Sequence, residues 1–162
     1  MDLFLIRHAE AVDRKEFAGN DEERPLTEAG QAQAKGLGTG LSAHKVRLDL
    51  LLTSPLVRAQ QTAQGMLETW KGAVPELRVC EELAPGARRK KLARYLRALE
   101  VESLGLVGHM PDLGDFTAWL LGDKAIQIDL AKAGVVHLSC PQPPNKGAAA
   151  LVWMITPEWL PS

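Results

Sequence analysis

Short, continuous apolar runs recur along the chain and limit the folds open to it. The runs at 3–6, 48–52 and 104–107 are apolar apart from Asp49 and do not alternate regularly with polar residues, which is typical of strands buried on both faces of a sheet. Further strands are predicted at 77–80, 135–139 and 150–155, and the last two are close enough in sequence to pair antiparallel. Strands that alternate with helices predict an α/β three-layer sandwich, with a mostly parallel sheet flanked by helices.

Helical segments separate these runs. Thr27 is placed to cap a helix that begins at Glu28 and weakens at Gly36, Gly38 and Gly40, a stretch we interpret as a frayed helix end. Pro111 suits the first turn of a helix. The remaining polar stretch at 13–25 is predicted to be a surface loop. Helices are expected over 56–70, 88–99 and 111–121.

Composition narrows the possible functions. The 162 residues carry a net charge of −1, so no overall basic field attracts nucleic acid or an anionic membrane. No run approaches the length of a membrane span, and the N-terminal apolar run is too short for a signal sequence. Cys80 and Cys140 lack a metal-ligand spacing and are expected to be buried free thiols. We expect a single domain over 1–162 and a cytoplasmic protein that binds neither nucleic acid nor membrane.

Polar residues follow the apolar runs where each predicted strand ends. Arg7 and His8 follow the first run, and His109 follows the run at 104–107. The run at 48–52 leads into Thr53-Ser54-Pro55, with Arg58 in the first turn of the next helix. Ligands of open α/β sheets bind outside the carboxyl ends of the strands. The sequence therefore predicts that two histidines and two arginines meet at one edge of the sheet.

Phosphoryl transfer is the chemistry that suits these side chains. Guanidinium groups match the geometry of phosphoryl oxygens through paired hydrogen bonds. A neutral imidazole can attack phosphorus and carry it as phosphohistidine, and nearby arginines favour the neutral form. A second imidazole can donate a proton to a phosphoryl oxygen. Acidic residues near the histidines lack a metal-ligand spacing, so neither a metal nor another cofactor is expected.

At these residues the sequence resembles the histidine phosphatase superfamily, which has the phosphoglycerate mutase-like fold. Residues 5–10 resemble its Arg-His-Gly signature, 53–63 its second arginine motif and 107–109 its second histidine motif. The likeness is closer to the SixA branch, the phosphohistidine phosphatases. Residues 24–30 match the RPLT-x-x-G segment of that branch, 108–113 its H-x-P segment and 153–157 its C-terminal end.

The resemblance implies a role for each site residue. His8 is the expected nucleophile, and Arg7, Arg58 and His109 are expected to bind the phosphoryl group and stabilise its transfer. Glu82 is similar in position to the proton donor of the superfamily. Ala9 replaces the glycine of the broad signature, and an alanine would be strained there if the position required a positive φ.

The size of the chain and the resemblance together suggest the substrate. The chain leaves no room for the helical lid of larger relatives, so an open site is expected to act on a phosphohistidine-carrying protein such as a phosphotransfer domain. The alternatives are a small-molecule phosphomonoesterase of the same superfamily and a phosphoryl-binding module without turnover. The basic run from Arg88 to Arg97 is interpreted as a solvated helix face, with the docking of an acidic partner as an alternative. His44 and His137 lie outside every motif.

Overall fold

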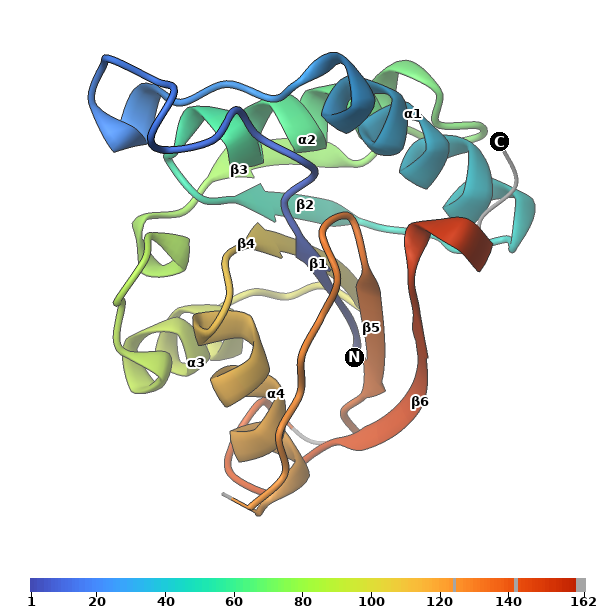
Figure 1. Ribbon diagram of the computed structural model, residues 1–162. Helices are drawn as coiled ribbons and strands as arrows, with labels where there is room; N and C mark the ends of the chain where they lie inside the picture. The colour runs from blue at the N-terminus through green and yellow to red at the C-terminus, as the bar shows by residue number, and fades with distance from the viewer. Residues whose placement is uncertain (124, 142, 160–162) are drawn as a thin grey trace.

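The structure is a computed structural model that describes residues 1–123, 125–141 and 143–159. One six-stranded sheet in the order β3-β2-β4-β1-β5-β6 forms its centre (Figure 1). The strands are β1 (Asp2–Arg7), β2 (Leu50–Thr53), β3 (Glu76–Val79), β4 (Ser103–Gly108), β5 (Val135–Ser139) and β6 (Ala150–Ile155). The helices are α1 (Glu28–Ala43), α2 (Val57–Glu68), α3 (Arg89–Arg97) and α4 (Asp112–Leu121). Short 3₁₀ turns lie at η1 (Asp21–Glu23), η2 (Glu81–Leu83) and η3 (Pro157–Trp159).

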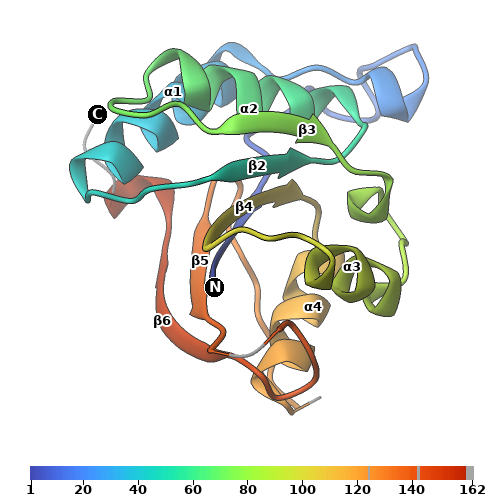
Figure 2. The same cartoon turned by 180° about the vertical axis from the view of Figure 1, so that it is seen from behind.

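The sheet is mostly parallel, as the alternation of strands and helices predicts. β1, β2, β3 and β4 run parallel to one another, whereas β5 pairs antiparallel with both β1 and β6. Helices α1 and α2 cover one face and α3 and α4 cover the other, which gives three layers (Figures 1 and 2). The predicted α/β sandwich and the late antiparallel pair are confirmed.

The continuous apolar runs are buried on both faces of the sheet. In β1, Leu3 and Leu5 pack into the core beneath α3 and α4, while Phe4 and Ile6 pack beneath α1 and α2. Because successive side chains of a strand point to opposite faces, only a strand covered on both sides can be apolar throughout. The two cores therefore hold the central strands rigidly, and with them the residues at their carboxyl ends.

One helix differs from its prediction. The Oγ1 atom of Thr27 accepts a hydrogen bond from the Gly30 amide at 3.0 Å, so the predicted cap is confirmed. The predicted fraying at Gly36–Gly40 is wrong, because α1 continues to Ala43. A Cβ atom at Gly38 would lie 2.0 Å from the carbonyl oxygen of Met66 in α2. The glycine permits close packing of α1 against α2, and this tertiary contact outweighs the weak helix propensity of glycine.

Two predictions from composition can also be compared with the fold. Cys80 and Cys140 are both buried and free, as expected. Across the described ranges, no helix has the length and apolar character needed to cross a bilayer.

Candidate active site

The strand register brings the two predicted histidines together. Arg7 at the end of β1 lies opposite Gly108 at the end of β4, and the next residue of each strand is a histidine. The His8 amide donates a hydrogen bond to the carbonyl oxygen of Gly108 at 3.0 Å. The rings of His8 and His109 lie 5.1 Å apart between centroids. Parallel pairing of two strands with polar ends is therefore sufficient to create the pair.

A hydrogen bond to the backbone fixes the tautomer of His8. Its Nδ1 atom lies 2.7 Å from the carbonyl oxygen of Ala9. A carbonyl oxygen can only accept, so Nδ1 carries the proton and donates it. In a neutral ring the lone pair is then on Nε2. His8 thus has Nδ1 occupied and an available lone pair on Nε2.

The electrostatic surroundings keep both rings neutral. Burial and, to a smaller extent, the charges of Arg58 and Arg7 together lower the pKa of His8 from 6.5 to about 4, although the hydrogen bond to the Ala9 carbonyl partly opposes this shift. Burial also lowers the pKa of His109 to about 3, with contributions from His8 and Arg58. Desolvation and nearby cations both disfavour the imidazolium form. Both imidazoles are therefore neutral at pH 7.

His109 is held by the end of β2. Its Nε2 atom shares a hydrogen bond of 2.8 Å with the hydroxyl of Ser54, and both side chains are buried. The Ser54 amide in turn donates to the carbonyl oxygen of Val107 in β4 at 2.9 Å. The Thr53-Ser54-Pro55 segment thus positions His109, and it also precedes the helix that carries Arg58.

Arg58 belongs to a cluster of arginines around Asp21. The Nη1 atom of Arg58 donates to the backbone oxygen of Asp21 at 2.8 Å, and its Nη2 atom lies 3.2 Å from Oδ2 of the same residue. Arg24 donates through Nε to Oδ1 of Asp21 at 3.0 Å, and Arg14 reaches the same oxygen at 3.5 Å. Desolvation alone would raise the pKa of Asp21, but the hydrogen bond from Arg24 and the charge of Arg58 hold it below its usual value.

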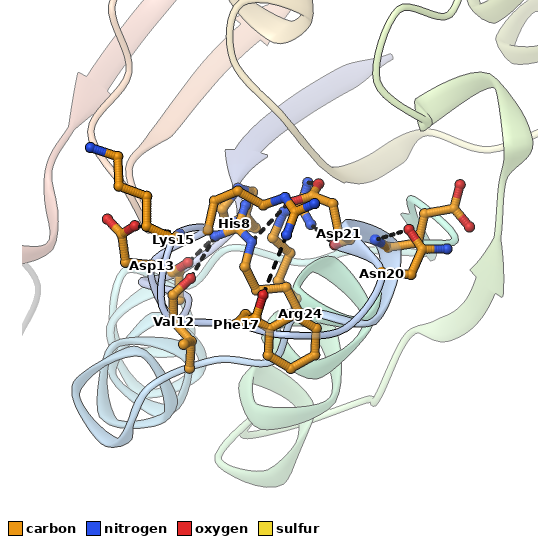
Figure 3. Close-up of polar contacts among 12 residues, drawn as sticks. His8, Val12, Asp13, Lys15, Phe17, Asn20, Asp21 and Arg24 are labelled. Carbon is orange, nitrogen blue, oxygen red and sulfur yellow. Dashed lines mark hydrogen bonds and ion pairs between the residues drawn. The ribbon is translucent and has the colours of Figure 1, made fainter.

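Sequence reasoning missed Asp21 and assigned no site role to Arg24. Figure 3 draws both with His8 and other residues of the 12–24 loop. The charge of Arg24 acts on both site histidines. Its Nη1 atom donates to the carbonyl oxygen of Val12 at 2.8 Å, which folds the loop back on itself. Arg24 begins the RPLT segment, and that match was the signal that could have revealed it.

The loop after His8 is fastened to the helical layer. The Ala9 amide donates to Oγ1 of Thr62 in α2 at 3.0 Å. Oγ1 of Thr27 donates to a carboxylate oxygen of Glu10 at 2.9 Å, and a Cβ at Gly30 would lie 1.9 Å from the Glu10 carbonyl oxygen. The glycine of the RPLT-x-x-G segment is therefore required by close backbone approach. Ala9 does not have a positive φ, so the alanine at this position is not strained.

The two remaining predicted site residues are Arg7, which lies beside His8, and Glu82, which lies on the side of His109. Arg7 donates through Nη1 to the carbonyl oxygen of Leu130 at 2.7 Å, which orients its guanidinium beside His8. Glu82 lies in η2 and lines a small hollow together with His109 and Arg89. Its carboxylate accepts a hydrogen bond from the Cys80 thiol at 3.5 Å. The structure thus places Glu82 on the His109 side of the site, with no contact to His8 among the described hydrogen bonds.

Several buried nitrogens of this cluster lack partners. Nε of Arg7, Nε of Arg58 and Nδ1 of His109 have no hydrogen-bond partner within the described residues. Leaving a buried donor or acceptor unpaired costs about 1–3 kcal/mol. Such unsatisfied polar groups are uncommon in native proteins, and three of the four in the described residues lie in this cluster, the fourth being Nδ1 of His137. This edge of the sheet is therefore the candidate functional site.

Two neutral imidazoles among guanidinium groups, at the carboxyl edge of a parallel sheet, define a phosphatase site of the histidine phosphatase type. The profile of the Histidine phosphatase superfamily (branch 1) matches residues 3–96, and the chain belongs to this superfamily.

Comparison with individual relatives indicates the branch of the superfamily. Phosphohistidine phosphatase SixA of Escherichia coli is 30% identical over 128 residues, which cover 74% of this chain and 74% of SixA. An uncharacterized protein of Picosynechococcus is 35% identical over 173 residues and 99% of each chain. The solved structure of the protein histidine phosphatase SixA complexed with tungstate superimposes with a TM-score of 0.85, at 25% identity and 97% coverage of both chains. The protein is a hydrolase of the SixA type, and the resemblance inferred from its motifs is confirmed.

Proposed function

We propose that the protein removes the phosphoryl group from phosphohistidine on another protein, with His8 as the nucleophile and residues 1–162 acting as one domain. The observation that carries this proposal is the state of the His8 ring. Its Nδ1–H donates to Ala9 and its pKa is lowered to about 4, so Nε2 has an available lone pair at neutral pH. Nucleophilic catalysis by histidine requires both conditions.

The reaction then has two displacements at phosphorus. The lone pair of His8 Nε2 forms a P–N bond while the P–N bond to the substrate imidazole breaks. The leaving imidazole takes a proton and departs neutral. Water next attacks the phosphorus and gives up a proton, the bond to Nε2 breaks, and inorganic phosphate leaves with His8 restored. An imidazole is a less demanding leaving group than an alkoxide, so this sequence needs less help from a protein acid.

Arg7, Arg58 and His109 are proposed to stabilise the transferred group. A phosphoryl group in transfer spreads negative charge over three oxygens, which fixed guanidinium groups can neutralise. The contacts of Arg7 with Leu130 and of Arg58 with Asp21 hold both guanidiniums before substrate arrives. Preorganised cations of this kind need little rearrangement during the reaction, which is the main source of their catalytic effect.

Trapping of the phosphoenzyme tests this mechanism. The protein is mixed with a ³²P-phosphohistidine carrier protein and quenched in base, because phosphohistidine is stable in base and labile in acid. Wild type is expected to retain label that acid releases, and His8→Ala is expected to retain none. Turnover by wild type is expected to be the same with and without a chelator. Phosphate release by His8→Ala at the wild-type rate would reject the nucleophile.

A second candidate is a phosphatase for a small phosphomonoester. The placement of Glu82 and His109 around one hollow favours it, because an alkoxide leaving group needs a proton donor. Glu82→Gln separates the two functions. If the physiological substrate is a phosphomonoester, Glu82→Gln should lower kcat at least ~100-fold on sugar or nucleotide monophosphates. Wild-type preference for phosphohistidine protein, together with little effect of Glu82→Gln on that reaction, would favour the first candidate.

A further inference from the structure

Helix α3 has an exposed basic face that the active-site chemistry does not use. Six arginines and lysines lie within residues 88–97, whereas the whole chain has 19 in 162 residues. Leu92, Ala93 and Leu96 of this helix are buried against the sheet. The basic residues point away from that core and are all exposed: Arg88, Arg89, Lys90, Lys91, Arg94 and Arg97.

No acidic side chain forms an ion pair with these basic residues in the described part of the chain. None of the ion pairs in residues 1–123, 125–141 and 143–159 involves a basic residue of α3. Segment 88–97 contains no acidic residue, although the protein as a whole has 20 aspartates and glutamates and is nearly neutral. The cluster is therefore a local positive surface on a protein without an overall positive field.

The arrangement is unfavourable for the helix itself. Arg89, Lys90 and Lys91 occupy the first turn, where the helix dipole favours negative side chains, and the cap residue Arg88 makes no side-chain capping bond. Each misplaced cation costs a few tenths of a kcal/mol. Local rules are most often broken at functional sites. The charge pattern of α3 is better explained by what the surface binds than by the stability of the helix.

The basic face continues from the active site. Arg89 lines the hollow that also contains His109 and Glu82. The Gly86 amide donates to a carboxylate oxygen of Asp112 at 3.0 Å, which ties the loop before α3 to the helix that follows His109. Figure 2 shows α3 beside α4, on the opposite side of the sheet from α1 and α2. A molecule whose phosphoryl group reached His8 past His109 would lie against the start of α3.

We propose that this basic face of α3 docks an acidic protein surface that surrounds the phosphohistidine of the substrate. The proposal rests on the proposed function, because it assigns the substrate class of the same site. Complementary charge at the rim of an interface mainly accelerates encounter and discriminates between partners. The effect is therefore expected in kcat/KM for protein substrates, with little change in kcat.

Two phosphohistidine peptides of equal length provide the test, one with Glu and Asp flanks and the other with Gln and Asn flanks. Wild type should prefer the acidic peptide in kcat/KM by about 10–100-fold at low ionic strength, and the preference should largely vanish near ~0.5 M salt. Lys90→Gln/Lys91→Gln/Arg94→Gln should bring the ratio close to one at both salt concentrations. Arg89 is left unchanged because it lines the hollow beside His109.

A matched variant controls for the loss of charge. Lys35→Gln/Arg47→Gln/Lys71→Gln removes the same number of charges from exposed positions outside α3. This control should behave as wild type on both peptides. Free phosphohistidine, which has no flanking charges, should be hydrolysed at the same rate by wild type and both variants. A preference that survives in the α3 variant, or a wild type without preference, overturns the docking surface and leaves the proposed function intact.

Failure of the proposed function would give a different result. Wild type would then hydrolyse phosphomonoesters but neither peptide nor free phosphohistidine. In that case, binding of the unphosphorylated acidic peptide is measured by calorimetry at low salt. Weaker binding by the α3 variant than by the control supports the docking surface, and equal binding rejects it. Tighter α3-dependent binding of single-stranded RNA than of the acidic peptide would also reject an acidic protein as the partner.

Discussion

His137 lies beside the start of β1, whereas His8 directly follows the end of that strand, and the two have opposite surroundings. His137 pairs with a carboxylate oxygen of Asp2 at 2.9 Å and stacks on Phe4 with ring centroids 4.3 Å apart. His8 bonds to a backbone carbonyl, and the charges of Arg58 and Arg7 act on its ring. Burial and these guanidiniums favour the neutral ring of His8.

This difference supports the proposed distinction between a structural His137 and a nucleophilic His8. Nε2 of His137 is hydrogen-bonded to Asp2 and its ring stacks on Phe4, while its Nδ1 is buried and has no hydrogen-bond partner among the described residues. In His8 only Nδ1 is occupied, which leaves Nε2 free to react. His137 lies in the middle of β5 opposite Phe4 of β1, whereas His8 follows the carboxyl end of β1, so both location and partners separate the two histidines.

The largest effect is expected from exchanging the two histidines for asparagine. His8→Asn removes the nucleophile and should lower kcat for phosphohistidine hydrolysis by about 10⁴-fold or more. His137→Asn should keep wild-type kcat while losing about 1 kcal/mol of unfolding free energy, because it loses the stack on Phe4 and the hydrogen bond to Asp2. Steady-state kinetics and urea unfolding measure the two effects. Equal losses of activity in the two variants would contradict the distinction.

A smaller but still large effect is expected from the arginines. Arg58→Gln should lower kcat/KM by about 10²–10³-fold, and Arg58→Lys should recover only part of that loss because an ammonium group cannot form paired bonds to phosphoryl oxygens. Arg78→Gln is the matched control, since Arg78 pairs with Glu76 at an exposed position on the outer strand β3. Its activity should equal wild type. Thermal unfolding checks that Arg58→Gln is folded under assay conditions.

The sequence predicted the strands and their polar ends because both depend on local pattern. For that reason the sequence could predict four site residues, each of which lies at or soon after a strand end: Arg7, His8, Arg58 and His109. Parallel pairing of the strands then brings these ends together. The role of Asp21 could not be predicted from the sequence, because its contact with Arg58 depends on the path of the chain after His8, which returns through the Ala11–Leu26 bridge. Residues 13–25 have polar composition but no periodicity that would give this path.

The glycines of α1 illustrate the same limit. Intrinsic propensity predicts that a helix weakens at Gly38, whereas in the fold this residue lets α2 approach and the helix continues. Close approach is a property of two helices and is absent from the sequence of either. Glu82 is intermediate. Its position was inferred from resemblance, and the structure places it by His109, but its role as a proton donor stays a prediction.

The neutral histidines should make the fold sensitive to acid. The unfolded state binds a proton on each ring near pH 6.5, while the folded state does so only near pH 4 for His8 and pH 3 for His109. The unfolded state therefore binds more protons in this window, and stability falls as pH decreases from about 6.5 towards 4, by at most about 1.4 kcal/mol per pH unit for each ring. The lowered pKa of Asp21 acts only at lower pH.

Urea unfolding between pH 7 and 4.5 measures this slope. The double variant His8→Asn/His109→Asn should lose much less stability over that range than wild type does. Identical slopes in the two proteins would mean that the rings titrate normally in the folded state. That result would also remove the electrostatic support for a neutral, nucleophilic His8.

The smallest effect is expected from Asp21, the acidic residue that pairs with the site arginines. Asp21→Asn removes a negative charge but keeps an oxygen for Arg24, and the backbone oxygen of Asp21 still holds Arg58 at 2.8 Å. The arginines should therefore stay in place while the site becomes more positive. Because Asp21 is about 39% exposed, solvent screens the change, and inhibition by inorganic phosphate should strengthen only about 2–5-fold. Asp13→Asn, at an exposed position of the same loop, should leave phosphate inhibition unchanged. Weaker phosphate inhibition of Asp21→Asn would show instead that the carboxylate holds Arg58 in position. Asp21 would then have a structural role at this site, as Asp2 has beside His137.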